Sequence, residues 1–137
     1  MPSIEDTLAV HALIAEYSHI IDGREWDELP RLFTNDGIFD ASSVGYPPVE
    51  GMAALRKHME TADHPITHMV TNIVLKDIDA DTMTAACLVL TPTAEGLMAP
   101  GDYRDIIVRT NDGWRFKKRV VLPRYHGDAI PRRPTPE

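Results

Sequence analysis

"ITHMVTNIVLKDI", residues 66–78, is where the hydrophobic pattern of the chain changes its period. Before this stretch apolar residues recur at three- and four-residue steps, and within and after it they recur mostly at every second position. The first spacing is typical of a helix that buries one face, and alternation is typical of a strand. The chain is therefore predicted to fold its helices first and its strands afterwards, as an α+β domain.

Alternation divides the side chains of this first long strand between two faces. One face is expected to carry His68, Val70, Asn72 and Val74, and the other Met69, Thr71, Ile73 and Leu75. The second set suits packing against another layer, whereas the first mixes apolar groups with an imidazole and an amide, as a cavity wall would. A histidine on a strand is also often solvated or satisfied in the core, so His68 matters only if the fold gives it a partner.

Several further strands are predicted around this one. They cover residues 38–44 (after a turn at 34–37), 82–92, 102–110 and 114–122. The sequence "NDG" between the last two is a strong signal for a hairpin. Trp114 and Phe116 are expected in the core, and strict alternation from Trp114 would place Arg119 on the opposite face. Most charges of these strands are expected on a solvated sheet face or in cross-strand pairs.

Three helices are predicted before residue 65. The first begins after Ser3, a capping residue whose partner Asp6 lies three positions on. It ends at Gly23, where left-handed backbone is easiest. Its buried face is outlined by Ile4, Leu8, Leu13, Tyr17, Ile20 and Ile21. Asp27 is expected to cap a short second helix with Pro30 in its first turn, and Met52, Leu55 and Met59 outline the third.

Two residues of the first helix are unusual for their positions. Tyr17 lies on the buried face, where a core tyrosine with one partner for its hydroxyl is the simplest interpretation. Asp22 lies at the carboxyl end, where the helix dipole disfavours a carboxylate by about 0.3–1 kcal/mol. A surface carboxylate of no functional consequence remains an alternative, and a partner that offsets the dipole is the other.

Composition excludes several classes of protein. A length of 137 residues suits one domain, and a formal net charge of −7 disfavours nucleic acid or an anionic membrane as a partner. The single cysteine, Cys87, excludes an intramolecular disulfide framework and a cysteine zinc cluster. No apolar run approaches the roughly 20 residues of a membrane span, and the amino terminus lacks the pattern of a signal peptide. A cytoplasmic protein is expected.

The order of these elements resembles the SnoaL-like branch of the nuclear transport factor two-like superfamily, and most closely the group of scytalone dehydratase and bile-acid dehydratase. The resemblance covers roughly residues 4–123. Four segments carry it: "EYSHIIDGREWDELPRLFTNDGIFD" (16–40), "VEGMAALRKHM" (49–59), "HMVTN" (68–72) and "GDYRDIIVRTNDGWRFKKRVV" (101–121). Residues 126–137 have no hydrophobic period and are expected to form a flexible tail, and the resemblance implies one domain at 1–125. Its expected shape is a cone: a curved antiparallel sheet wrapped around three amino-terminal helices and enclosing an apolar pocket.

The resemblance also implies a site. Tyr17 and Asp22 would project into the pocket, and His68 would approach Asp22 from the facing strand. His68 would be the general base and acid, kept basic by Asp22, while Tyr17 polarises a substrate oxygen. Asn72, Val70, Tyr103 and Arg119 are the expected substrate-binding residues. No second pocket carboxylate can be placed from the sequence, which argues against the Asp-Arg-Asp scheme of limonene epoxide hydrolase relatives.

The function that the resemblance implies is a cofactor-independent, metal-free lyase or isomerase of dehydratase type. Its substrate would be a hydrophobic oxygenated small molecule such as a polyketide, a steroid or another polycycle. A dimer or trimer joined through the outer sheet face is expected. Because this fold hosts many activities, a non-catalytic ligand-binding or assembly protein remains the alternative.

Overall fold

The computed structural model describes residues 2–124, and the predicted tail at 126–137 lies outside them. The elements in chain order are α1 (Ile4–Asp22), the 3-10 helix η1 (Trp26–Arg31), β1 (Phe33–Asp40), the 3-10 helix η2 (Ser42–Val44), β2 (Val49–Glu50), α2 (Met52–Thr61), β3 (Met69–Asp79), β4 (Thr82–Pro92), β5 (Met98–Thr110) and β6 (Gly113–Pro123). The predicted α+β class is confirmed. The helices-first order holds only in part, because β1 and β2 precede α2 and the other four strands follow it.

Six strands form one sheet in the order β2-β1-β6-β5-β4-β3. Neighbours pair antiparallel except β1 and β6, which run parallel. The parallel pair departs from the expected antiparallel sheet. β1 and β6 are not joined by a hairpin: α2 and the strands β2 to β5 lie between them in the chain. The predicted turn at 34–37 lies inside β1, where the register with β6 shifts between Phe33 and Ile38.

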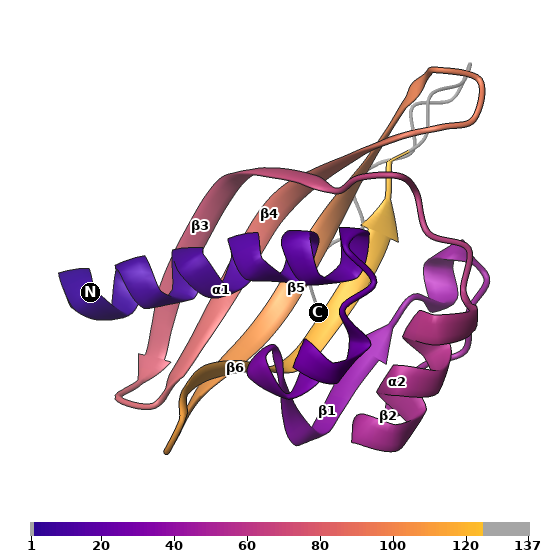
Figure 1. Ribbon diagram of the computed structural model, residues 1–137. Helices are drawn as coiled ribbons and strands as arrows, with labels where there is room; N and C mark the ends of the chain where they lie inside the picture. Colours follow the sequence, from indigo (N-terminus) through magenta and orange to yellow (C-terminus); the bar gives the residue numbers. More distant parts are fainter. Residues whose placement is uncertain (1, 125–137) are drawn as a thin grey trace.

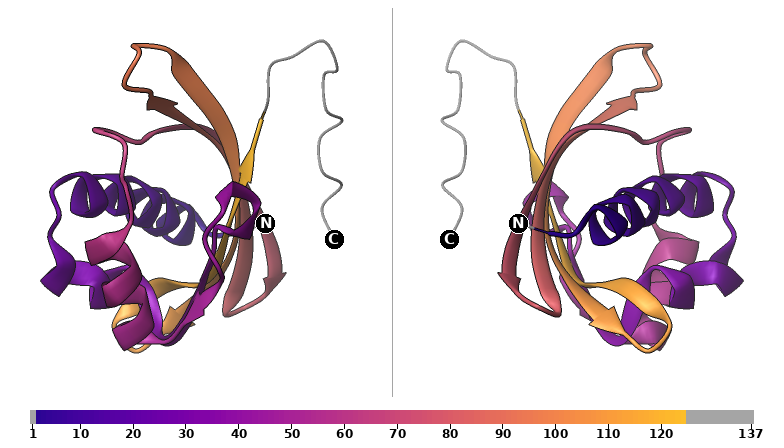
Figure 2. Two further views of the ribbon diagram at one scale, coloured as in Figure 1. Left: turned by 90° about the vertical axis from the view of Figure 1, so that its right-hand side faces the viewer. Right: turned by 90° about the vertical axis from the view of Figure 1, so that its left-hand side faces the viewer.

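The helices cover one face of the sheet. α1 runs across β3 to β6, and α2 with η1 lies next to β1 (Figure 1). The side views show the sheet curving around α1, with its other face turned away from all helices (Figure 2). The core between these layers includes Ile14, Tyr17, Ile21, Leu29, Leu32, Phe33, Leu55, Met59, Ile107 and Phe116, each 2% exposed or less. None of the helices within 2–124 is long and apolar enough to cross a membrane.

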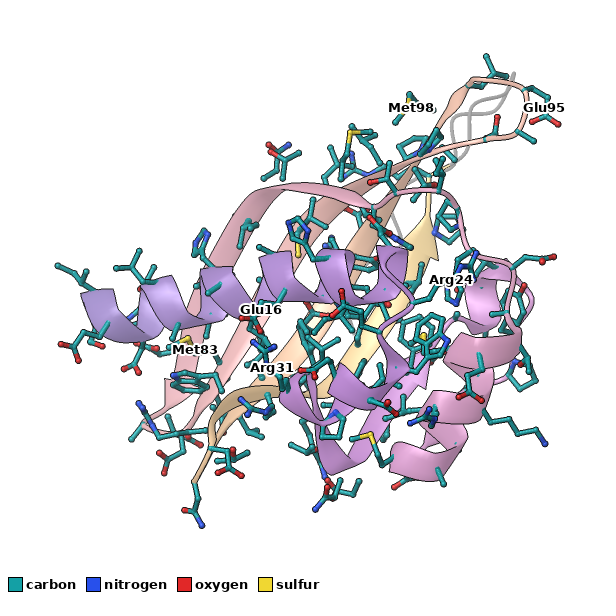
Figure 3. The ribbon with its side chains drawn as sticks, viewed as in Figure 1. Glu16, Arg24, Arg31, Met83, Glu95 and Met98 are labelled. Carbon is teal, nitrogen blue, oxygen red and sulfur yellow. The ribbon has the colours of Figure 1, made fainter. Side chains whose placement is uncertain are left out.

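The end of α1 holds Asp22 in place through a turn that differs from the predicted one. Gly23 has an ordinary right-handed backbone, and Arg24 takes the left-handed conformation, with φ 55° (Figure 3). The N–H groups of Arg24 and Glu25 donate to the carbonyls of Ile21 and Ile20, which is the Schellman pattern. A Cβ on Gly23 would lie 2.9 Å from the His19 carbonyl oxygen, so close approach explains this glycine.

Two β-bulges overturn the predicted alternation of the long strands. In β3 the register shifts between Thr71 and Val74, so that Asn72, with φ 55°, is exposed and Val74 also points outward. Beyond the bulge the inward positions are Ile73 and Leu75, which pack against the core. An extra residue in one strand shifts the faces of all residues that follow it. The expected common face of His68, Val70, Asn72 and Val74 is therefore wrong.

The second bulge lies in β6 opposite β5. Ile106 pairs with Lys118, whereas Ile107 pairs with Phe116, so Lys117 is the extra residue. Trp114 and Phe116 are buried, as predicted, and after the bulge Arg119 is buried on the same side. The expectation that Arg119 faces away from the core is wrong for this reason.

Candidate active site

A cavity of about 220 Å³ opens between the concave side of the sheet and the helices. Its wall is formed by Tyr17, Phe39, Ala41, Val44, Tyr46, His58, Ala62, Asp63, His64, Pro65, His68, Val89, Thr91, Ala99, Pro100, Gly101, Tyr103, Val121 and Pro123. Most of these side chains are apolar or aromatic, and the few polar ones include three histidines. Small-molecule sites have this composition, with a few polar groups that fix the ligand's orientation.

Asp22 and His68 form a hydrogen-bonded pair at this wall. The Nδ1 atom of His68 lies 2.6 Å from an Asp22 carboxylate oxygen, and the His68 side chain is only 9% exposed. The other Asp22 oxygen accepts from the Thr67 hydroxyl at 3.0 Å and from the backbone N–H of His68 at 3.1 Å. Three donors thus stabilise a carboxylate that the helix dipole alone would disfavour.

This pairing fixes the tautomer of His68. A carboxylate accepts hydrogen bonds, so Nδ1 carries the proton and the neutral ring keeps a lone pair on Nε2. Burial lowers the pKa of His68 below its ordinary value of 6.5, although the hydrogen bond and charge of Asp22 act in the opposite direction. Asp22 thus raises the pKa of the imidazole, as expected, but burial outweighs it in the net shift. The ring is poised to accept a proton at neutral pH.

The lowered pKa makes a prediction for stability. In the unfolded chain His68 binds a proton near pH 6.5, while the folded protein resists protonation until lower pH. The contribution of His68 to the free energy of unfolding is therefore fully present above about pH 6.5, the pKa in the unfolded chain. It is lost as the pH falls through the lower pKa of the folded protein. We therefore expect the free energy of unfolding to fall less between about pH 8 and 5 in His68→Gln than in the wild type. Urea denaturation at a series of pH values measures this difference.

His11, exposed on α1, supplies the control for that series. The loss of stability at acid pH in His11→Gln should match that of the wild type, because the His11 side chain lies on the surface, away from the Asp22–His68 pair. Equal pH slopes for the wild type and His68→Gln would contradict the stated environment of His68.

Tyr17 lies next to the pair and is 2% exposed. Its ring packs edge-on against His68 at 6.3 Å and against Tyr103 at 5.8 Å, measured between centroids. Burial raises the pKa of Tyr17 to about 12, with the Arg119 charge opposing the shift. The phenol is therefore neutral throughout the physiological range and can donate a hydrogen bond into the cavity that it lines.

A buried ion pair, Arg119 with Asp105, packs against these aromatic rings. Arg119 donates from Nε and Nη2 to the two oxygens of Asp105, each at 2.8 Å, and both side chains are fully buried. The guanidinium carbon lies 4.2 Å from the ring centroid of Tyr17, 3.9 Å from that of Tyr103 and 4.1 Å from that of Phe116. The charge is thus enclosed by aromatic faces, a favourable arrangement for arginine.

The structure brings together only part of the predicted set. Tyr17, His68 and Tyr103 line the cavity, and Asp22 stands behind His68. Val70 packs against the core rather than lining the cavity. Arg119 is likewise not among the lining residues, because it packs behind the ring of Tyr17. Asn72 is exposed on the bulge of β3, so its predicted place in the pocket is wrong.

Sequence reasoning missed two histidines and a carboxylate of the wall. His58 comes from α2, and Asp63 and His64 come from the segment between α2 and β3. The expectation of no second pocket carboxylate is therefore wrong, since the exposed Asp63 lines the cavity. The sequence shows three histidines between residues 58 and 68, but their spacing does not indicate that all three line one cavity.

The residues that the structure describes offer neither a metal-binding group nor a reactive cysteine. No group of three or more His, Cys, Asp or Glu side chains within 2–124 is arranged to hold a metal ion. Cys87 is buried, and burial raises the pKa of its thiol to about 12, with the neighbouring Asp105 adding to the shift. A thiolate, the reactive form, is thus disfavoured.

Comparison with known proteins places this site in context. Residues 2–120 match the model of the SnoaL-like domain. The protein Rv2910c of Mycobacterium tuberculosis, whose function is uncharacterised, is 30% identical over 133 residues, covering 85% of this chain and 84% of its own. A candidate aromatic ring hydroxylase of Novosphingobium aromaticivorans has 26% identity and a TM-score of 0.77, covering 90% and 92% of the two chains.

A candidate scytalone dehydratase from the same organism superposes with a TM-score of 0.73 and 22% identity, covering 98% of this chain and 97% of its own. At that identity the likeness shows the fold alone.

Proposed function

The chain belongs to the family of SnoaL-like domains, and from that premise we propose that it is a cofactor-independent lyase or isomerase. Its substrate is a hydrophobic, oxygenated small molecule such as a polyketide, a steroid or another polycycle. The likeness in fold to a candidate scytalone dehydratase favours dehydratase-type chemistry within this class. The observation that carries the proposal is the Asp22–His68 pair, at 2.6 Å, in the wall of an apolar cavity beside a neutral phenol.

Each group has one role in the proposed reaction. The free Nε2 of His68 removes a proton from the carbon next to a substrate carbonyl, and Asp22 stabilises the imidazolium that forms. Tyr17 donates a hydrogen bond to the carbonyl oxygen as negative charge develops there. Loss of a hydroxyl group from the neighbouring carbon completes a dehydration, and return of the proton to another carbon completes an isomerisation.

The rival proposal is a ligand-binding protein of the same fold without catalysis. A panel of enones and β-hydroxy ketones separates the two, because each compound is tested both for turnover and for its effect on the melting temperature. Turnover supports the enzyme. Stabilisation without turnover across the panel supports the binder, since any ligand of the folded state raises the melting temperature.

Tyr17→Phe tests the role of the phenol. The variant keeps the ring that packs against Arg119 and loses only the hydroxyl, so a small change in stability is expected. Turnover should fall by about a hundredfold to a thousandfold if the hydroxyl polarises the substrate. Tyr103→Phe is the matched control, because Tyr103 also lines the cavity and packs on Arg119. Equal effects of the two variants would contradict a specific role for Tyr17.

Self-association through the outer sheet face stays a prediction. Val74 and Ile106 point outward from that face and are 56% and 40% exposed. Apolar side chains on a face that no helix covers suit a contact between copies of the chain.

A further inference from the structure

His64 lines the same cavity as His68 but takes no part in the Asp22 pair. Its Nε2 atom lies 2.7 Å from the backbone carbonyl oxygen of Met59. A carbonyl can only accept a hydrogen bond, so Nε2 carries a proton in every state of this arrangement. The other ring nitrogen, Nδ1, is then the free one.

The position of this imidazole is fixed by its neighbours. Pro65 follows it and restricts the backbone of His64 to extended conformations. The ring lies 5.6 Å from the Trp26 ring on one side and 6.4 Å from the His68 ring on the other, measured between centroids. His64 is therefore held at a defined place in the wall.

The two imidazoles are anchored through opposite nitrogens. His68 is held at Nδ1 by Asp22 and keeps Nε2 free, whereas His64 is held at Nε2 by Met59 and keeps Nδ1 free. Ring centres 6.4 Å apart leave the two groups able to act on neighbouring atoms of one small substrate. A dehydration needs two such groups, because a proton leaves one carbon while the departing hydroxyl on the next carbon needs a proton.

Resting on the proposed function, we propose that His64 is the second proton-transfer residue of the site and protonates the leaving hydroxyl. His68 starts neutral and takes the proton from carbon through Nε2. The electrons of the broken C–H bond form the new C=C bond, and those of the broken C–O bond leave with the oxygen. The Nδ1 proton of the His64 imidazolium converts the leaving group to water. His68 ends protonated and His64 neutral, and proton exchange with solvent restores the starting state.

The cavity is suited to one positive charge on the two rings. The charged and titratable groups around them are His58 from α2, Asp63 beside His64, Asp22 and Tyr17 from α1, Tyr46 before β2, Tyr103 from β5 and Arg119 from β6. Burial lowers the pKa of His68, and the charge of a protonated His64 lowers it further. A proton on His64 thus disfavours a proton on His68, so His68 remains the base when His64 carries the charge.

A purely structural role for His64 is the alternative. The Met59 carbonyl belongs to the last turn of α2, whose carbonyls lack partners within the helix, so the imidazole could serve only as a cap. His64→Gln separates the two roles, because the glutamine amide can still donate to this carbonyl but cannot titrate. His11→Gln, on the exposed side of α1, is the matched control.

The first measurement does not depend on turnover. Nitrogen-15 NMR of the imidazoles, followed against pH, should show the His68 pKa moving upward in His64→Gln and staying unchanged in His11→Gln. A His68 titration that is the same in all three proteins would overturn the proposal, because the two rings would then not share a charge.

The second measurement follows conversion of 3-hydroxy-1-tetralone, a two-ring β-hydroxy ketone, to fluorescent 1-naphthol. In His64→Gln kcat should fall by about a hundredfold with little change in KM, and the alkaline decline of the wild-type rate should disappear. Activity in the wild type with a kcat within about threefold in His64→Gln would overturn the role of His64 alone. Absence of turnover in the wild type, for this compound and the wider panel, would count against the proposed function itself and against His64 with it.

Discussion

His68→Ala is expected to abolish turnover of whichever substrate the panel identifies. The variant loses the imidazole that the Asp22 carboxylate orients, and with it the Nε2 lone pair that accepts the proton. General acid–base groups contribute roughly a hundredfold to ten-thousandfold to rates, so kcat should fall by at least about a thousandfold if His68 serves as both base and charge carrier. Stopped-flow and long steady-state assays cover this range.

Stability should change much less than activity in the same variant. Asp22 keeps its hydrogen bonds from Thr67 and from the backbone N–H of residue 68, so no buried charge is left without donors. A loss of about 1.5–3 kcal/mol in the free energy of unfolding is expected from one hydrogen bond to a charged group. His19→Ala, on the exposed side of α1, should leave both properties unchanged. Turnover in His68→Ala within tenfold of the wild type would refute the assignment.

Asp22→Asn provides a graded comparison. Asparagine keeps an oxygen that can accept from His68 Nδ1, so the ring should remain in place. The variant lacks the negative charge that stabilises the imidazolium, and turnover should fall less than in His68→Ala. A larger loss in Asp22→Asn than in His68→Ala would mean that the carboxylate, rather than the imidazole, acts on the substrate.

The fold class could be predicted because it depends on local hydrophobic period. The strand at 82–92 matches β4, and the helix outlined between Ile4 and Asp22 matches α1. The parallel pairing of β1 with β6 could not be predicted, since it joins segments separated by about half the chain and no local signal specifies it.

The faces of the long strands could be predicted only as far as the first bulge. A single extra residue exchanges the two faces, and a bulge has little sequence signature apart from a residue that tolerates left-handed backbone. Asn72 is such a residue, so its place within the strand is a usable signal for the bulge rather than for the pocket. In β6 the adjacent Lys117 and Lys118 gave no comparable indication.

The burial of the Arg119–Asp105 pair could not be derived from sequence for a related reason. Alternation predicts these charges on a solvated sheet face or in cross-strand pairs, and Asp105 and Arg119 do pair across β5 and β6. Their burial is the part that the sequence does not predict, because charged side chains are rarely buried. Their burial depends on the β6 bulge, on the register of β5 against β6, and on three aromatic rings contributed by α1, β5 and β6. These are properties of the assembled layers rather than of any one segment.

Asp105→Ala is expected to be the most destabilising single change at this site. It leaves the Arg119 guanidinium fully buried with no opposite charge, and one of its nitrogens, Nη1, already has no hydrogen-bond partner among the described residues. Breaking a buried ion pair in this way costs about 3–5 kcal/mol. Because a domain of this kind has a free energy of unfolding of roughly 5–15 kcal/mol, urea denaturation should show a large fall in the midpoint or an unfolded protein.

Two further variants show whether the uncompensated charge is the cause. Asp105→Leu combined with Arg119→Met removes both charges and should recover most of the lost stability, since apolar replacements of a buried pair are often neutral. Glu16→Ala breaks an exposed pair, Glu16 with Arg31 at 3.0 Å, whose side chains meet between α1 and η1 (Figure 3). That change should cost less than about 1 kcal/mol, because solvent screens the pair. If Asp105→Ala were no more costly than Glu16→Ala, the guanidinium would have to reach solvent, and the packing of Tyr17 and Tyr103 on it would be refuted.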